Sequence, residues 1–230
     1  MSDNLEKRLK ELDLNRDDLN PVLTKDSNYC LLLHQEKLSV YHRLEKHYIN
    51  VDFLSKQLNY RSQSHIFSEL IVKAVLGKKK QALNILDCTA GFGKDAYILS
   101  LADCKITANE SNILMYALLK DGLKRAHITS IHLSNIDSFD VVNTNQCEVI
   151  YLDPMYPSSN KSAKNNKYMT FLQQFVGHQQ DTAEQLFIKA LASSAKKIVI
   201  KRPPKAEFIN QHKPTSQIIG KSARFDIYVI

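Results

Sequence analysis

The chain has 230 residues, of which 43% are hydrophobic and 24% are charged, and its formal net charge is +7. This composition supports the buried core of one domain of ordinary size and excludes an intrinsically disordered chain. Apolar runs such as residues 31–33 are far shorter than the roughly 20 residues that cross a bilayer, so we expect no membrane association. Residues 1–6 lack a basic region followed by an apolar one, so we also expect no secretory signal.

The four cysteines and eight histidines show no metal-binding spacing. Each cysteine stands alone in an apolar context, and the sequence contains neither a Cys-x-x-Cys pair nor a His-Glu-x-x-His pattern. Isolated thiols of this kind are typical of reduced, buried cysteines in a cytoplasmic protein. We therefore predict a cytoplasmic protein without a metal site.

The first 57 residues predict a small β-rich subdomain. Residues 3–20 are charged with spaced leucines, which indicates a short helix that Pro21 ends. Three short β-prone runs follow, at residues 29–33, 38–41 and 48–53. Their spacing predicts an antiparallel meander. It contains no catalytic constellation, so a substrate-facing role and plain packing both remain open.

Residues 58–230 predict an α/β domain. A helix at residues 66–75 stops at Gly77, and a regular alternation of elements begins near residue 82. We expect strands at residues 84–87, 105–108, 131–134, 149–153 and 198–201, helices at 96–101, 113–123 and 181–191, and a closing hairpin over 218–230. Strands that alternate with helices imply a mostly parallel sheet wound on both faces. With a terminal antiparallel hairpin, this is the arrangement of a Rossmann-like class I methyltransferase.

A glycine turn follows the first strand of this domain. Gly91 and Gly93 allow a tight turn whose backbone N–H groups approach a ligand closely. Asp87 precedes the turn and Glu110 ends the next strand, and a carboxylate there suits the hydroxyls of a ribose. Together the turn and its two acids favour an S-adenosylmethionine site. The alternative is a packing turn in another kind of α/β protein.

A second candidate site is the stretch Asp-Pro-Met-Tyr-Pro at residues 153–157. An exocyclic amine of a base is a poor nucleophile unless hydrogen-bond acceptors orient it. The Asp153 side chain and the Pro154 carbonyl are two such acceptors, which the prolines hold in place. Tyr156 can stack on the base. Asp153 either takes the released proton or only positions the amine. The alternative for the whole stretch is a purely structural role, as a rigid turn with a core tyrosine.

Basic residues near the strand ends suggest contact with phosphate groups. The candidates are Lys161, Lys164, Lys201 and Arg202. A solvated surface, or a cap on the strand end, is the alternative for each of them. For Arg224 and Asp226, which share a face two residues apart, we expect a simple ion pair.

Several stretches together resemble the ribosomal RNA small subunit methyltransferase J family. They are residues 87–95 (DCTAGFGKD), 151–157 (YLDPMYP), 161–163 (KSA), 201–203 (KRP) and 224–228 (RFDIY). The resemblance runs from about residue 51 to residue 230. It implies methylation of a guanine N2 in the 3′ region of 16S rRNA, with S-adenosylmethionine as cofactor. By position, it assigns cofactor contacts to Lys94, Asp95, Glu110, Ser111, Ser134, Asn135 and Asp153.

We therefore expect a 16S rRNA (guanine-N2)-methyltransferase that acts in rRNA processing with the small ribosomal subunit as its partner. A monomer is slightly favoured. One alternative is an amino-methyltransferase on tRNA guanine or DNA adenine. Another is a nucleotide- or RNA-binding module without catalytic activity, or a nicotinamide oxidoreductase.

Overall fold

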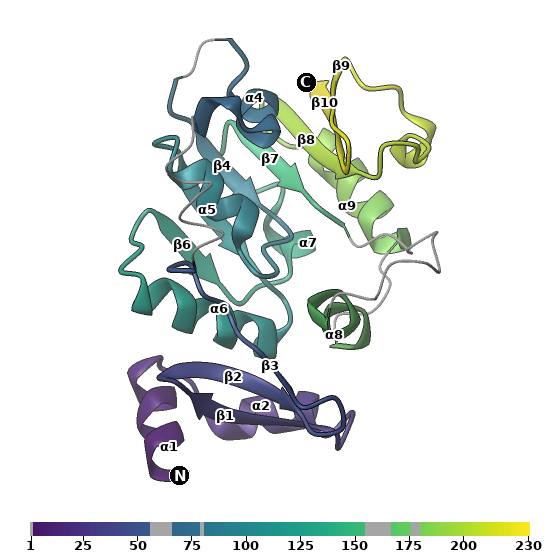
Figure 1. Cartoon of the computed structure of the whole chain (residues 1–230). Helices are drawn as coiled ribbons and strands as arrows, with labels where there is room; N and C mark the ends of the chain where they lie inside the picture. The colour runs from purple at the N-terminus through teal and green to yellow at the C-terminus, as the bar shows by residue number, and fades with distance from the viewer. Residues whose placement is uncertain (1, 56–65, 79–80, 155–166, 176–179) are drawn as a thin grey trace.

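The computed structural model describes residues 2–55, 66–78, 81–154, 167–175 and 180–230 (Figure 1). These residues form a large mixed sheet covered by helices, and a small sheet with two N-terminal helices beside it (Figure 1). None of the helices within those ranges is both long and apolar enough to span a membrane.

Two short helices begin the chain. They are α1 (Ser2–Glu11) and α2 (Arg16–Leu23). The prediction of one helix over residues 3–20 is wrong, because the Asn15 side chain accepts from the Asp17 N–H and starts a second helix. Pro21 does not end this helix but lies inside α2. A helix of two turns tolerates it because the proline removes only one intrahelical hydrogen bond.

The small sheet is the predicted meander. Its strands are β1 (Tyr29–His34), β2 (Lys37–His42) and β3 (His47–Ile49), paired antiparallel in the order β1-β2-β3. Gln35 and Glu36 both have positive φ, 50° and 59°, which is the backbone of a tight hairpin turn between twisted strands. The third strand ends at Ile49, earlier than the predicted residue 53.

The large sheet has seven strands within the described residues, in the order β6-β5-β4-β7-β8-β10-β9. The strands are β4 (Asn84–Asp87), β5 (Lys105–Asn109), β6 (Ile131–Ser134), β7 (Val149–Leu152), β8 (Lys197–Arg202), β9 (Ser216–Ile219) and β10 (Arg224–Val229). The strands from β4 to β8 pair in parallel, whereas β10 is antiparallel to both β8 and β9. This confirms the predicted mostly parallel sheet with a C-terminal antiparallel hairpin.

The helices of this domain are α4 (Leu70–Leu76), α5 (Lys94–Ser100), α6 (Ile113–Arg125), α7 (Ser138–Val141), α8 (Lys167–Phe175) and α9 (Gln180–Leu191), with short 3-10 turns at Ile66–Ser68 and Ile209–Gln211. As predicted, Gly77 ends α4, with a φ of 65°. The sequence patterns did not predict α7 or α8.

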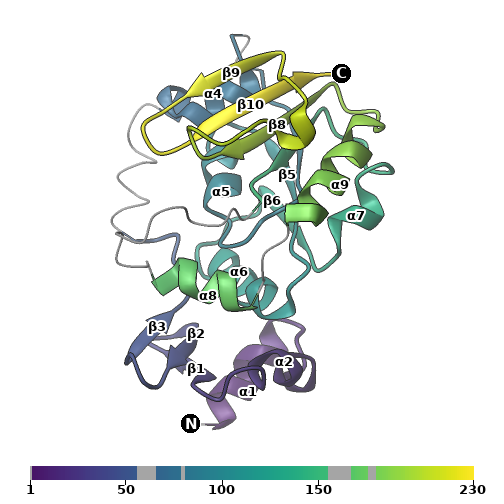
Figure 2. The same ribbon diagram turned by 90° about the vertical axis from the view of Figure 1, so that its right-hand side faces the viewer.

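Helices cover both faces of the large sheet because its inner strands are apolar on both sides. Along β7, Val149 and Tyr151 pack in the core shared with α4, α5 and α6, whereas Ile150 and Leu152 pack in a second core with α7 and α9. Successive side chains of a strand point to opposite faces, so a continuous apolar run requires cover on each side. Figure 2 shows α9 and α5 on the two sides of the sheet.

The N-terminal elements share one core with the elements around the large sheet. Leu9 and Leu38 are buried with Leu118 of α6 in the same apolar cluster. The contact is close, because a Cβ added at Gly122 of α6 would lie 2.6 Å from Val51 Cγ1. The predicted boundary at residues 57–58 lies outside the described residues, so the subdomain division stays a prediction.

Candidate active site

The glycine turn joins β4 to α5 at the carboxyl edge of the sheet. Asp87 ends β4 fully buried, and its Oδ1 accepts the Thr89 N–H at 3.0 Å. Gly91 and Gly93 have φ angles of 51° and 68°, which glycine adopts without strain. Gly93 is also crowded, because a Cβ there would lie 2.5 Å from Leu119 Cδ1. At Gly91 an added Cβ meets only the Thr89 carbonyl at 3.9 Å among the described atoms, so the turn borders open space.

Glu110 ties this turn to the loop after β5. Its carboxylate accepts the Gly91 N–H at 2.9 Å and the Asn112 N–H at 2.8 Å. Burial raises the pKa of Glu110, while the two backbone N–H groups oppose that shift. The Asn135 side chain donates to the carbonyls of Glu110 at 2.7 Å and Ser111 at 3.2 Å. The loops after β4, β5 and β6 are therefore held together, as a ligand site across three strands requires.

A second group joins the glycine turn to the loop after β7. The Asp153 N–H donates to Thr89 Oγ1 at 2.7 Å. The Lys201 ammonium lies between two carboxylates, 2.8 Å from Asp95 Oδ2 and 2.7 Å from Asp153 Oδ2. The Tyr151 hydroxyl donates to the same Asp95 oxygen at 2.7 Å. Four elements, β4, α5, β7 and β8, thus converge on one polar cluster.

Burial controls the protonation of this cluster. It raises the pKa of Asp87 to about 7 despite the Thr89 hydrogen bond, and neighbouring carboxylates add to the shift. Burial also raises the pKa of Asp153 to about 6, with Lys201 opposing the shift and Asp95 adding to it. Burial disfavours the Lys201 ammonium, but the carboxylates of Asp153 and Asp95 outweigh that effect and raise its pKa. Lys201 therefore stays charged at neutral pH.

The structure brings most of the predicted cofactor residues to one edge. Asp87, Gly91, Gly93, Asp95, Glu110, Ser111, Asn135 and Asp153 lie in the contacts described above, and Ser134 accepts the Glu110 N–H through its carbonyl at 3.1 Å. Lys94 is exposed at the start of α5, with its ammonium 5.4 Å from the Tyr168 ring centroid. Their roles as cofactor contacts stay predictions.

Most of the remaining predicted site residues either lie outside the described residues or have partners other than those predicted. Tyr156, Lys161 and Lys164 lie outside the described residues, and Pro154 is buried beside Asp153. Arg202 is largely buried and its guanidinium donates to the Glu207 carbonyl, which favours the strand-capping alternative. Lys201 has carboxylate partners where we predicted phosphate.

Arg224 and Asp226 form the expected ion pair. Arg224 Nε lies 2.8 Å from Asp226 Oδ1, and Nη2 lies 2.9 Å from Oδ2. Both residues are buried in β10. The pair is a structural feature of the strand, as the sequence analysis expected.

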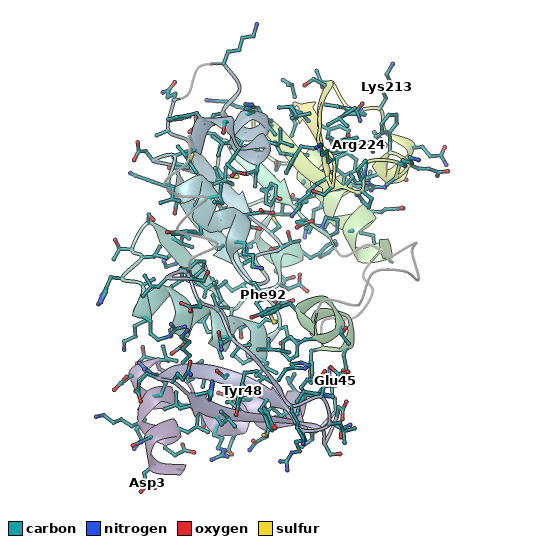
Figure 3. The ribbon with its side chains drawn as sticks, viewed as in Figure 1. Asp3, Glu45, Tyr48, Phe92, Lys213 and Arg224 are labelled. Atoms are coloured by element: carbon teal, nitrogen blue, oxygen red, sulfur yellow. The ribbon has the colours of Figure 1, made fainter. Side chains whose placement is uncertain are left out.

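Sequence reasoning missed Thr89, Tyr151 and the aromatic residues beside the turn. Phe92 lies beside α8 in Figure 3, with its ring centroid 5.1 Å from that of Tyr168. Tyr151 could have been predicted from its position. It lies in β7, two residues before Asp153, so the two side chains point to the same face of the sheet, the one that α5 covers. The prediction of α8 would have needed the Phe171–Phe175 spacing, which is too short a pattern to stand alone.

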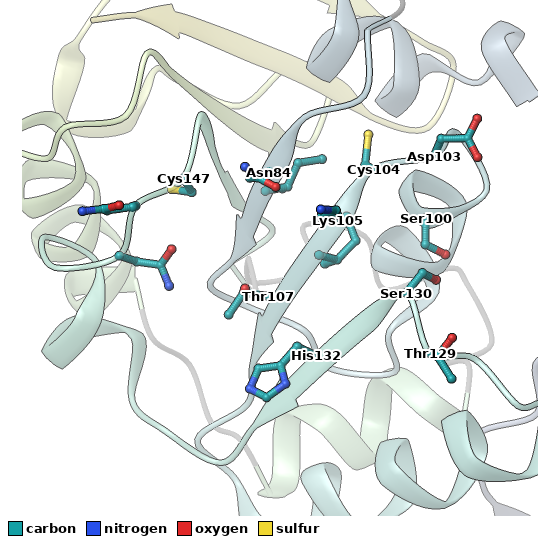
Figure 4. Close-up of a pocket in the computed structure, with 14 residues that line it drawn as sticks. Asn84, Ser100, Asp103, Cys104, Lys105, Thr107, Thr129, Ser130, His132 and Cys147 are labelled. Atoms are coloured by element: carbon teal, nitrogen blue, oxygen red, sulfur yellow. The ribbon is translucent and has the colours of Figure 1, made fainter.

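Other polar groups lie away from this edge. A pocket of about 640 Å³ lies where β4, β5 and β6 begin, at the opposite edge of the sheet (Figure 4). It contains none of the four acids described above. In the β2–β3 turn, the ligand atoms of His42, Glu45 and His47 lie within 4.8 Å of one another. Glu45 contacts both rings there, its N–H donating to His42 Nδ1 at 3.0 Å and its carboxylate lying 3.2 Å from His47 Nδ1.

The strand order, the acid-flanked glycine turn and its position at the carboxyl edge define a Rossmann-like S-adenosylmethionine-dependent methyltransferase. Comparisons with known proteins agree with this class. A family model described as a putative SAM-dependent methyltransferase matches residues 14–230. A SAM-dependent methyltransferase structure from Neisseria gonorrhoeae is 30% identical, with a TM-score of 0.67, over 88% of this chain and 83% of that chain.

Curated relatives narrow the class. The ribosomal RNA small subunit methyltransferase J of Thioalkalivibrio sulfidiphilus is 38% identical over 194 residues, which are 79% of this chain and 76% of that protein. The protein of the same name from Francisella philomiragia is 33% identical over 218 residues, or 90% of each chain. The chain belongs to the ribosomal RNA small subunit methyltransferase J family.

Proposed function

We propose that this enzyme methylates the exocyclic N2 of a guanosine in the 3′ region of 16S rRNA. The observation that carries the proposal is the position of Asp153. Its carboxylate stands at the end of β7 and its N–H is bonded to the glycine turn through Thr89. An acceptor for an amine is thereby placed beside the turn that binds the cofactor in this class. The names of the curated relatives supply the rRNA substrate.

The charge of the site fits S-adenosylmethionine. This edge carries the four carboxyl groups of Asp87, Asp95, Glu110 and Asp153, and the Lys201 ammonium lies between those of Asp95 and Asp153. A net negative cluster suits a ligand that carries a sulfonium and an amino group. Glu110 and the backbone at Gly91 would hold its ribose and amino acid portions. When bound, the cofactor supplies a methyl group on a positively charged sulfur.

The chain's own groups prepare the amine and remove its proton. Because the pKa of Asp153 is about 6, its carboxyl is mainly ionised at neutral pH and accepts a hydrogen bond from N2. With the Pro154 carbonyl as a second acceptor, the nitrogen lone pair is directed at the methyl carbon. Transfer is direct, without a covalent enzyme intermediate. The nitrogen then loses one proton, either to Asp153 or to water.

Contacts with the RNA complete the proposal. A guanine that reacts at N2 must leave its stack, which costs a few kcal/mol. Stacking on Tyr156 offsets about 1–3 kcal/mol of this cost, and phosphate contacts from Lys161 and Lys164 offset more. Because the substrate is ribosomal, we place the enzyme in the cytoplasm.

The substrate is tested by offering the protein labelled cofactor with separate pools of small ribosomal subunits, naked 16S rRNA, tRNA and DNA. We expect label in 16S rRNA, with the modified nucleoside identified by mass mapping as N2-methylguanosine near the 3′ end. Label confined to tRNA or DNA would reject the substrate. Calorimetry with S-adenosylhomocysteine and NADH covers the remaining alternatives, and binding of NADH alone would exclude a methyltransferase.

A further inference from the structure

We propose that Lys201 is a positioning residue for methyl transfer, which clamps the Asp153 acceptor to Asp95 at the start of the cofactor-side helix α5. The inference rests on the proposed function. It goes further by giving Lys201 a role inside the active site in place of a contact with rRNA phosphate.

The geometry supplies the first argument. The Lys201 ammonium reaches Oδ2 of both aspartates, at 2.8 Å for Asp95 and 2.7 Å for Asp153. An ammonium has three donors on a flexible stem and can bridge two carboxylates in this way. Because both ion pairs use Oδ2, we assign Oδ1 of Asp153 to the target amine. The clamp therefore fixes which oxygen of the carboxylate is presented.

Electrostatics supply the second argument. The charged and titratable groups that face Asp153 are Lys201 from β8, Asp95 from α5, Tyr151 from β7 and Asp87 from β4. Burial raises the pKa of Tyr151 well above its usual value, so its hydroxyl keeps its proton, donates to Asp95 and carries no charge. Lys201 is the one cation in this described set. Without it, two carboxylates and a third buried acid would repel one another, and Asp153 would bind a proton.

A proton on Asp153 would impair its function. A protonated carboxyl has lost the negative charge that attracts the amine and can no longer take up the proton released from N2. The Lys201 charge therefore sets the lowest pH at which the enzyme works. A phosphate contact by the same ammonium makes a different prediction, because it would require the lysine to leave both carboxylates and would affect RNA affinity.

The test compares Lys201→Met and Lys201→Arg with a matched control, Lys196→Met. Lys196 lies just before β8, at the opposite end of the strand, and its ammonium pairs with Glu148 with 80% of the side chain exposed. Two readouts are recorded: the pH dependence of kcat and kcat/KM on 16S rRNA, and direct titration of the Asp153 carboxyl by 13C NMR, assigned with Asp153→Asn.

We expect a wild-type midpoint for Asp153 near 6. Lys201→Met should raise the midpoint by at least about one pH unit, which lowers activity at pH 6 by at least about fivefold through the ionised fraction. KM for RNA should change by less than about threefold. Lys201→Arg keeps the positive charge, so its Asp153 midpoint should lie close to the wild-type value. Lys196→Met should match the wild type.

An unchanged Asp153 titration in Lys201→Met would overturn the proposal. So would an effect confined to the KM for RNA with a shallower salt dependence, which is the signature of a phosphate contact. If Lys201→Met does not fold, Asp95→Asn provides the complementary NMR test, since loss of the Asp95 charge should lower the Asp153 midpoint.

The NMR titration needs no turnover, so it separates the two proposals. A wild-type protein that modifies no 16S rRNA, but shows the Lys201-dependent titration, would reject the substrate and keep the clamp. If the protein methylates 16S rRNA but the Asp153 titration does not change in Lys201→Met, the substrate is kept and the role of Lys201 is rejected.

Discussion

At the scale of single residues, side-chain alternation explains how the site is assembled. Asp87 and Tyr151 lie on strand positions that face α5, Asp153 follows directly after β7, and Lys201 reaches the same face from β8. The acids could be predicted because each ends a strand in a recognisable pattern. The partner of Lys201 could not, since a strand-end lysine on a basic protein fits phosphate as well as carboxylate. Only the neighbouring strands decide between them.

The roles of Asp153 can be separated by two substitutions. Asp153→Ala should lower kcat by about 10²–10⁴, because it removes both the acceptor and the proton-binding group. Asp153→Asn keeps an acceptor oxygen, so it should retain much more activity if the carboxylate only positions the amine. Single-turnover rates with 16S rRNA measure both variants. A rate for Asp153→Ala within about threefold of the wild type would contradict a role in the reaction.

Asp87 should make stability depend on pH. Its folded pKa of about 7 lies above the ordinary value of 3.8, so the folded state holds the proton over the interval between them. The contribution of Asp87 is therefore favourable below about pH 4 and is lost as the pH rises to 7. Asp153 acts with the same sign up to about 6.

Urea unfolding between pH 4.5 and 8 measures this dependence. We expect Asp87→Asn to lose a smaller part of its unfolding free energy than the wild type as the pH rises, since the amide does not titrate. Asp140→Asn, at an exposed position of α7, is the matched control and should keep the wild-type slope. Equal slopes for the wild type and Asp87→Asn would show that Asp87 titrates normally.

At the scale of elements, the alternation of strands and helices was sufficient to predict the large sheet. β4 to β8 and the closing hairpin appear close to the predicted residues because buried parallel strands leave continuous apolar runs. Short elements were missed: α7 has only four residues. The break between α1 and α2 was also missed, because Asn15 acts as a cap within an otherwise helical pattern.

The glycine turn offers a test at this scale, since its two glycines are needed for different reasons. Gly93→Ala should lower the free energy of unfolding by about 2–5 kcal/mol, because a positive φ costs about 1–2 kcal/mol and the clash with Leu119 adds about 1–3 kcal/mol. Gly91→Ala has the first cost only. Urea unfolding of both variants measures the difference, and equal losses would mean that Leu119 moves aside freely.

At the scale of the whole molecule, Asp121 joins the N-terminal elements to the methyltransferase domain. This fully buried residue of α6 accepts the Leu38 N–H of β2 at 3.1 Å and Arg125 Nε at 2.7 Å, and Arg8 Nε of α1 lies 3.5 Å away. This network could not be predicted, because Leu38 and Arg8 lie more than eighty positions from Asp121 along the chain. Such contacts depend on tertiary packing.

Removing this carboxylate should loosen the N-terminal elements. Asp121→Ala removes one carboxylate partner from the partly buried guanidinium groups of Arg8 and Arg125 and leaves the Leu38 N–H without its acceptor, which costs about 1–3 kcal/mol. We expect that loss in urea unfolding and faster proteolysis of residues 2–55. Asp13→Ala is the control, because Asp13 is 92% exposed and lies 3.9 Å from Lys120; such a pair contributes about 0–1 kcal/mol. A wild-type cleavage rate in Asp121→Ala would show that the apolar core alone fixes the N-terminal elements.

The place of β10 in the large sheet has a consequence for protein synthesis. β10 follows β8 and β9 in the sequence, yet it lies between them. Translation therefore produces both neighbours before the strand that joins them. A copy terminated before residue 224 would carry two unpaired backbone edges, and such edges recruit other strands or remain open to proteases. Because of these exposed edges, incomplete copies of this enzyme should aggregate or be degraded before any of them could occupy a ribosomal substrate.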